Sequence, residues 1–196
     1  MKFKIFKFDE VTSTNDVAIY LIKNKKKKYG CVYSKKQTNG RGRRGNKWIS
    51  NYGNLFGSIF FPLKNDYPPF NEFSLINSVL IHDIIKKLCN KSKISIKWPN
   101  DIFLNGKKIC GILQEVITLN SKKFLIIGIG INIKSSPNAN KKYQTTSIFK
   151  ETKKSPSLKK LISLIVDAYE NFFNEIDYYN YLKFKKKIDL IASQNI

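Results

Sequence analysis

The sequence predicts an α/β fold of the α+β kind, in which helices back a mixed β-sheet. Apolar residues recur at helical spacing in some segments, and short β-branched runs alternate with turn residues in others. The dipeptide Asn105-Gly106 between two apolar runs indicates a β-hairpin, so part of the sheet must be antiparallel. We therefore expect one domain over residues 1–196 that is not of the doubly wound parallel type.

The first half of the chain supplies two predicted helices. Ser13 or a neighbouring threonine can cap a helix over about 14–28. Residues 72–89 carry apolar side chains at helical spacing and form the second. Strands are expected over 30–34 and 54–61, with a loop between them from 38 to about 51.

The second half is richer in strands. Residues 94–98 read as a short strand that Pro99 stops, and the hairpin joins strands over 102–104 and 109–116. A nearly continuous apolar strand over 124–133 is interrupted by Gly128 and Gly130. A polar loop over 134–145 and helices over 157–176 and 178–190 complete the prediction.

Composition excludes several classes of protein. Hydrophobic residues make up 42% of the chain, so it is not disordered, and no long uncharged apolar run indicates a membrane span or signal peptide. The cysteines, Cys31, Cys89 and Cys110, are scattered and lack metal-ligand spacing. We expect a cytoplasmic protein with reduced thiols, no contact with a membrane and no metal-ligand set of its own.

The net charge of +22 at first suggests a nucleic-acid partner. All but three of the 36 basic residues are lysines, however, and they are spread along the chain together with many Ile and Asn residues. An AT-rich genome explains that bias, so we interpret most lysines as solvated surface residues. We expect no sequence-specific binding to DNA.

The three arginines, Arg41, Arg43 and Arg44, lie within four residues of a glycine-rich loop that also contains Trp48. A guanidinium binds carboxylate or phosphate through two parallel hydrogen bonds, which lysine cannot do. Glycines let main-chain N–H groups approach a ligand, and a tryptophan offers a flat face for a ring. Taken alone, the loop also fits an RGG-like nucleic-acid segment or a merely flexible basic loop. We expect it to be mobile without ligand and to order around an anion.

Two further features indicate a ligand site. Lys97 ends a strand just before Pro99, and we expect that bend to aim its ammonium group into a site. Gly128 and Gly130 interrupt a buried strand, which allows close approach of a ligand, although helix packing would explain them as well. The single histidine, His82, falls within a helical pattern and makes a catalytic triad improbable.

Four segments together resemble the biotin–protein ligase family. They are Ser13-Thr14-Asn15, the loop from Gln37 to Trp48, Lys97-Trp98-Pro99-Asn100-Asp101, and Gly128-Ile129-Gly130-Ile131-Asn132. The resemblance covers residues 8 to about 150 and implies the catalytic domain shared with lipoate ligases. We expect neither the N-terminal DNA-binding domain nor the C-terminal β-barrel domain that some members carry.

The resemblance also implies roles for individual residues. Lys97 and Arg43 would be catalytic and would meet the carboxylate and the α-phosphate. Residues implied to bind biotin are Ser13, Thr14, Asn15, Gln37, Gly40, Arg41, Gly42, Arg43, Lys97, Gly128 and Gly130. Those implied to bind the nucleotide are Arg41, Arg43, Arg44, Trp48 and Asn132.

The implied reaction is that of a biotin–[acetyl-CoA-carboxylase] ligase. With ATP and Mg²⁺ it would form biotinyl-5′-AMP and pass the biotinyl group to a lysine of a biotin carboxyl carrier protein, and a homodimer is compatible. Such chemistry needs fixed cations and no protein nucleophile. A lipoate or octanoate ligase of the same fold and a basic nucleic-acid-binding module are the alternatives.

Overall fold

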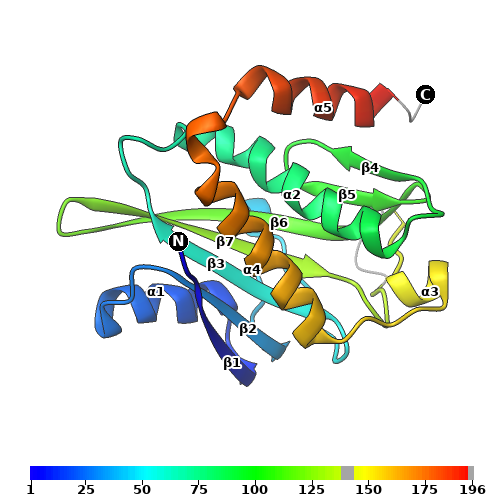
Figure 1. The fold of residues 1–196 in the computed structure, drawn as a ribbon. Coiled ribbons are helices and arrows are strands. Elements are labelled where there is room, and N and C mark those ends of the chain that lie inside the picture. Colours follow the sequence, from blue (N-terminus) through cyan, green and yellow to red (C-terminus); the bar gives the residue numbers. More distant parts are fainter. Residues whose placement is uncertain (138–143, 194–196) are drawn as a thin grey trace.

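A single seven-stranded sheet with helices on both faces forms the body of the protein (Figure 1). The computed structural model describes residues 1–137 and 144–193. The strands are β1 (Lys4–Val11), β2 (Gly30–Gln37), β3 (Leu55–Pro62), β4 (Ile94–Lys97), β5 (Asp101–Leu104), β6 (Lys107–Leu119) and β7 (Lys122–Ile131). Their order is β1-β2-β3-β7-β6-β5-β4. The pair β1–β2 is parallel and every other neighbouring pair is antiparallel, which confirms the predicted mixed sheet.

The helices are α1 (Thr14–Lys25), α2 (Phe73–Leu88), α3 (Ile148–Thr152), α4 (Leu158–Asn174) and α5 (Tyr181–Ser193). Short 3-10 turns lie at Arg43–Gly45, Phe70–Glu72 and Ile176–Tyr178. Helix α1 ends before residue 28, because Lys26 adopts a left-handed conformation and its N–H bonds back to the Leu21 carbonyl. Of the predicted polar loop over 134–145, residues 138–143 lie outside the described part of the chain.

Strand alternation divides the apolar residues between two faces of the sheet. On β7, Leu125 and Ile127 join the cluster formed with α2 and α4, whereas Phe124 and Ile126 join the cluster formed with α1. Gly128 and Gly130 continue the α1 side of the strand, where they add no side chain. The face covered by α1 is therefore open over the second half of β7.

The opposite face carries the larger core. Helices α2 and α4 cross it (Figure 1), and rings including Phe61, Phe73 and Phe173 pack edge-on or tilted between them. Helix α5 packs against α2 and β4 through Ile188 and Ile191. Side chains fill this face completely, and their packing holds the sheet against α2 and α4.

The three cysteines are free and buried within the sheet and at the end of α2. Burial raises the pKa of the Cys31 thiol to about 12 and that of Cys89 to about 11. These thiols are protonated at neutral pH and pack as small apolar side chains.

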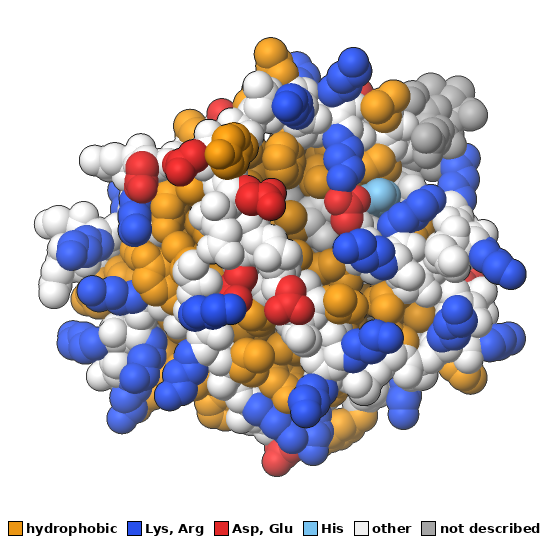
Figure 2. Space-filling view, viewed as in Figure 1, with side chains coloured by type: hydrophobic (Ala, Val, Ile, Leu, Met, Phe, Trp, Pro, Cys, Tyr) orange, Lys and Arg blue, Asp and Glu red, His pale blue; other side chains and the backbone are white. Residues whose placement is uncertain are grey.

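On the face shown in Figure 2, lysines and arginines are spread over the surface instead of gathering in one patch. On the face in that view they alternate with acidic and apolar side chains, as expected for solvated residues. None of the helices in the described ranges has the length and apolar character that crossing a membrane requires.

Candidate active site

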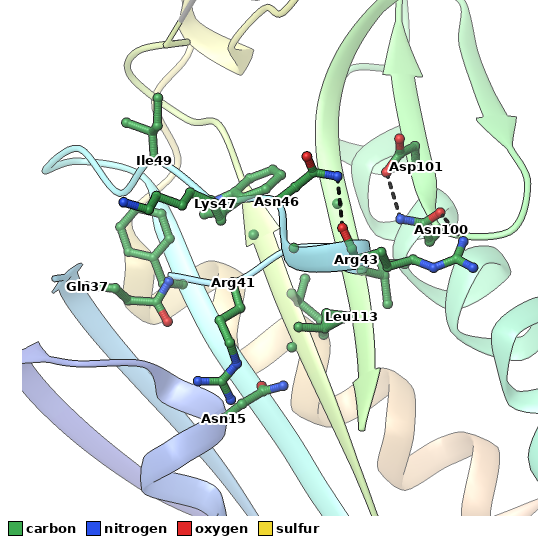
Figure 3. A pocket seen from close by; sticks show the side chains of 18 of the residues that line it. Asn15, Gln37, Arg41, Arg43, Asn46, Lys47, Ile49, Asn100, Asp101 and Leu113 are labelled. Atoms are coloured by element: carbon green, nitrogen blue, oxygen red, sulfur yellow. Dashed lines mark hydrogen bonds between the residues drawn. The ribbon is translucent and has the colours of Figure 1, made fainter. Parts of the chain in front are cut away.

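The open face of the sheet holds a cavity of about 610 Å³. Its floor comes from β3, β6 and β7, one side comes from the start of α1, and the loop after β2 covers it (Figure 3). The turn between β4 and β5 contributes Pro99 and Asn100 to the far side. Segments that lie far apart in the sequence therefore meet around one space.

One end of the cavity is a polar, hydrogen-bonded wall. Gln37 accepts through Oε1 from the backbone N–H of Thr14 at 2.8 Å and from its hydroxyl at 3.1 Å. The buried Ser58 hydroxyl lies 2.8 Å from Thr14 Oγ1 and 2.5 Å from Asn15 Oδ1, and its single proton can be donated to either oxygen. These contacts hold neutral donors and acceptors in fixed positions at this end.

Arg41 is ion-paired with two carboxylates at the same end. It donates to Asp16 at 2.8 Å and to both oxygens of Glu115 at 3.1 and 3.3 Å. Glu115 also accepts a 2.6 Å hydrogen bond from the amide of Asn15. The hydrogen bond to Asp16 is the main cause that raises the pKa of Arg41 above its usual range. Arg41, Asp16 and Glu115 together carry one positive and two negative charges, so the Arg41 charge is fully balanced at this end of the cavity.

The glycines of the floor make room for two side chains. A Cβ on Gly128 would lie 2.7 Å from Asn15 Oδ1, and a Cβ on Gly130 would lie 2.4 Å from the Trp48 ring. Gly111 on β6 faces the same ring, at 2.6 Å. The glycines thus let Asn15 and Trp48 lie directly on the sheet, and any larger residue would push them into the cavity.

The other end of the cavity is cationic. Lys108 is buried, its Nζ lies 2.8 Å from Asp101 Oδ1, and it stands 5.5 Å from the centre of the Trp48 ring. Arg43 donates to the neutral amide oxygen of Asn100 at 2.9 Å. Arg44 and Lys47 also line the cavity and are exposed. Across residues 1–137 and 144–193, neither of these two nor Arg43 forms an ion pair.

A β-bulge places Lys108 at this end. Ile102 pairs with Cys110 but Phe103 pairs with Lys108, so β6 contains one residue more than β5 at that point. The extra residue turns Lys108 to the face that carries Gly111. Regular alternation would have sent its side chain to the other face.

Two buried polar atoms beside Lys108 have no hydrogen-bond partner among the described residues. They are Nε1 of Trp48 and Oδ1 of Asn132, one a donor and the other an acceptor. The opposite end of the Asn132 amide donates to the Thr146 carbonyl at 3.1 Å, which fixes its orientation. Both residues line the cavity, so a bound molecule can satisfy these atoms.

Most of the predicted site residues meet in this cavity. Those that line it are Ser13, Thr14, Asn15, Gln37, Arg41, Gly42, Arg43, Arg44, Trp48, Gly128, Gly130 and Asn132. Gly40 does not line it. It is buried under the loop, where a Cβ would lie 2.5 Å from the Trp48 carbonyl oxygen, so its role is to let the loop close on itself.

The predicted position of Lys97 needs correction. The bend at Pro99 carries Pro99 and Asn100 to the cavity, whereas Lys97 is exposed outside it, with its Nζ 5.8 Å from the Phe103 ring centre. Alternation along β4 buries Ile94 and Ile96 and turns Lys97 outward.

Sequence reasoning also missed residues that line the cavity or hydrogen-bond to its walls. Lys108 was hidden among many lysines and by the bulge. Ser58 and Glu115 lie on strands that read as apolar, yet a polar residue on a buried strand face is a signal that could have identified both. Asp101 was noticed only as part of a motif. No three His, Cys, Asp or Glu side chains converge into a metal site in the described ranges.

Comparison with known proteins identifies the family of the chain. A model of the biotin/lipoate A/B protein ligase family matches residues 6–132, which is more than half of it. The chain belongs to this family. It is 34% identical over 125 residues to the bifunctional ligase/repressor BirA of Escherichia coli, covering 63% of this chain and 38% of that protein. It is 27% identical over 156 residues to the biotin–[acetyl-CoA-carboxylase] ligase of Paracoccus denitrificans, covering 76% and 65%. The chain therefore spans less than two thirds of either relative.

Solved structures of the family agree with the fold. The biotin protein ligase of Leishmania major in complex with biotin superposes with a TM-score of 0.86 at 26% identity, over 98% of this chain and 82% of that one. The enzyme of Aquifex aeolicus in complex with biotin and ATP gives 0.78 at 26% identity, over 94% and 76%. The predicted ligase-like fold is confirmed.

Proposed function

We propose that this protein activates biotin with ATP to form biotinyl-5′-AMP and transfers the biotinyl group to a lysine of a biotin carboxyl carrier protein. The observation that carries the proposal is the polarity of the cavity. Neutral hydrogen-bonding groups line one end, whereas Lys108, Arg43, Arg44 and Lys47 surround the other. Biotin has the same polarity, with a neutral ureido ring at one end and a carboxylate at the other.

Each end then has a distinct task. Thr14, Asn15 and Gln37 hold the ureido group, while Lys108 meets the carboxylate and the α-phosphate, the part that the sequence had assigned to Lys97. Two anions must approach each other for the anhydride to form, and fixed cations offset their repulsion. Arg43 contributes from the loop, which covers the cavity and keeps water from the anhydride.

The unpartnered atoms of Trp48 and Asn132 suit the nucleotide. The Asn132 oxygen can accept from an exocyclic amine of a base, and the Trp48 ring provides a stacking surface beside it. We propose that Mg²⁺ enters on the phosphates of ATP, because this ion is usually held by substrate phosphates, waters and only one or two carboxylates.

The polar wall also favours biotin over lipoate or octanoate. A dithiolane ring or an alkyl chain offers no hydrogen bond to Thr14, Asn15 and Gln37 and would displace water from them, which costs roughly 1–3 kcal/mol for each group so desolvated. The test is incubation with Mg²⁺-ATP, a carrier domain and biotin, lipoate or octanoate in parallel. Mass spectrometry should find the mass of biotin on one carrier lysine, and preferential attachment of lipoate would contradict the proposal.

The carrier of an acetyl-CoA carboxylase is the partner we propose to test first, with the matching carrier of another biotin-dependent carboxylase as the comparison. A carrier variant that lacks the acceptor lysine is the control. Biotinyl-AMP should still form with that variant, because activation does not need the carrier. Absence of pyrophosphate release without carrier would contradict the two-step order.

A further inference from the structure

Glu115 contacts two residues that line different parts of the cavity, Asn15 and Arg41. One of its oxygens accepts from the Asn15 amide at 2.6 Å, and both accept from Arg41 at 3.1 and 3.3 Å. Asn15 belongs to the polar wall and Arg41 begins the glycine-arginine loop. No other acidic residue in the described part of the chain contacts both.

The contact to Asn15 fixes the direction of its amide. Since Glu115 can only accept, the Asn15 nitrogen must point toward it and the oxygen must point toward Ser58, which lies 2.5 Å away. Gly128 beneath leaves the space that this orientation needs. Glu115 therefore determines which atom of Asn15 is available to a ligand.

The contact to Arg41 fixes the base of the loop. Asp16 and Glu115 share its guanidinium group, and 32% of the Arg41 side chain is exposed. Arg41 and Arg43 point in different directions: Arg41 runs down toward Asn15, and Arg43 runs toward Asn100 (Figure 3). The three arginines thus have different surroundings, and only Arg41 has its charge balanced by carboxylates.

We propose that Glu115 is a positioning residue that locks the Asn15 amide and anchors Arg41, so that Arg41 serves as the fixed base of the loop and not as an anion ligand. Arg43 and Arg44 remain as the cations of the moving tip. The part of this inference that concerns ligand affinity rests on the proposed function. The part that concerns the anchor does not.

The positions of the arginines allow a direct test of the anchor. Because residues 41, 43 and 44 are the only arginines of the chain, an arginine-specific protease can cut nowhere else. In the ligand-free wild type we expect cleavage after Arg43 and Arg44 and little after Arg41. Glu115→Ala should raise cleavage after Arg41 at least about fivefold, as the two carboxylates no longer share the guanidinium. Asp16→Asn should raise cleavage after Arg41 by a smaller factor. Asp83→Asn is the control, because it removes an ion-paired carboxylate from α2 on the other face of the sheet and should leave cleavage after Arg41 unchanged.

The second arm measures biotin affinity by calorimetry and the maximal rate of pyrophosphate release. Glu115→Gln keeps an acceptor for Asn15 but loses the charge that anchors Arg41, whereas Glu115→Ala loses both. We expect Glu115→Ala to weaken biotin binding at least about tenfold with a small change in the maximal rate at saturating biotin. Glu115→Gln should bind biotin with nearly wild-type affinity, whereas its cleavage after Arg41 should stay as high as in Glu115→Ala. A role in stability alone would instead lower the melting temperature without this separation.

The outcomes separate the two claims. Wild-type cleavage and wild-type affinity in Glu115→Ala would overturn the positioning role, and so would equal cleavage after all three arginines in the wild type. If Glu115→Ala does not fold, Glu115→Gln and Asp16→Asn still test the anchor by their cleavage after Arg41. A wild-type protein that binds no biotin would instead overturn the proposed function, while the protease result would stand by itself.

Discussion

The two faces of the sheet use the same strands in different ways. Toward α2 and α4, β7 presents Leu125, Ile127, Ile129 and Ile131, all of them buried in one continuous core. Toward α1, the strand presents two apolar residues and then Gly128 and Gly130, over which Asn15 and Trp48 lie. One face therefore supplies most of the folding free energy, and the other supplies a floor that a ligand can approach. Substitutions one residue apart should accordingly affect different properties.

The largest effect is expected at Lys108. Lys108→Ala removes the buried ammonium group at the cationic end of the cavity and should slow adenylate formation by about 10²–10³-fold, because one charge contact to a transition state contributes roughly 2–4 kcal/mol. Pyrophosphate release is the measurement. Lys97→Ala is the matched control, with nearly unchanged rates expected. A slow Lys97→Ala beside a normal Lys108→Ala would restore the assignment made from sequence.

Ile127 and Gly128 are neighbours that test the faces directly. Ile127→Ala leaves a cavity in the packed core and should lower the free energy of unfolding by about 2–5 kcal/mol. Gly128→Ala places a methyl group against Asn15 and should weaken biotin binding while denaturant unfolding changes much less. Equal losses of stability in the two variants would remove the distinction between the faces.

Arg43 tests the tip of the loop on the open face. Arg43→Ala should retain much of the ground-state affinity for biotin but release free biotinyl-AMP, because the loop no longer binds the anion. Arg43→Lys should correct this only in part, since an ammonium lacks the planar fork. Chromatography of the reaction supernatant measures the leak, and hydrogen exchange of residues 38–47 with and without biotin and ATP measures the closure. A loop equally protected in both states would show that it is not a lid.

The smallest effect concerns the pH dependence of stability at Glu151 on α3. Hydrogen bonds from Thr146 at 2.6 Å and Asn105 at 2.7 Å hold the pKa of Glu151 below its ordinary 4.5. A lowered pKa in the folded state means that this stabilisation is complete above about pH 4.5 and is lost as the pH falls through the folded value. Glu151→Gln should therefore show a shallower decline in unfolding free energy below pH 4.5 than the wild type. Parallel curves would contradict this assignment.

Sequence patterns predicted the helices and central strands well because burial there follows a simple period. They missed β1, an edge strand whose lysines alternate with half-buried phenylalanines, because charged residues on an edge obscure the pattern. The motifs located most of the cavity because their residues lie close together in sequence.

The position of Lys108 could not be read from periodicity, since it depends on a bulge that only the pairing of β5 with β6 reveals. The contact between Glu115 and Asn15 joins residues a hundred positions apart, and no local pattern encodes it. What escaped prediction is thus the side-chain geometry that tertiary contacts impose. For this reason, the sequence did not reveal that Lys108 lines the cavity and that Lys97 does not.

The burial of all three cysteines has a practical consequence for watching the loop in solution. Their thiols are shielded and remain protonated at neutral pH, so maleimide reagents should react with them slowly. A cysteine introduced at the exposed position Lys47 would then be the preferred attachment point for a fluorophore, without removal of any native thiol. The dye would report whether the loop approaches and leaves the cavity when ligands are added.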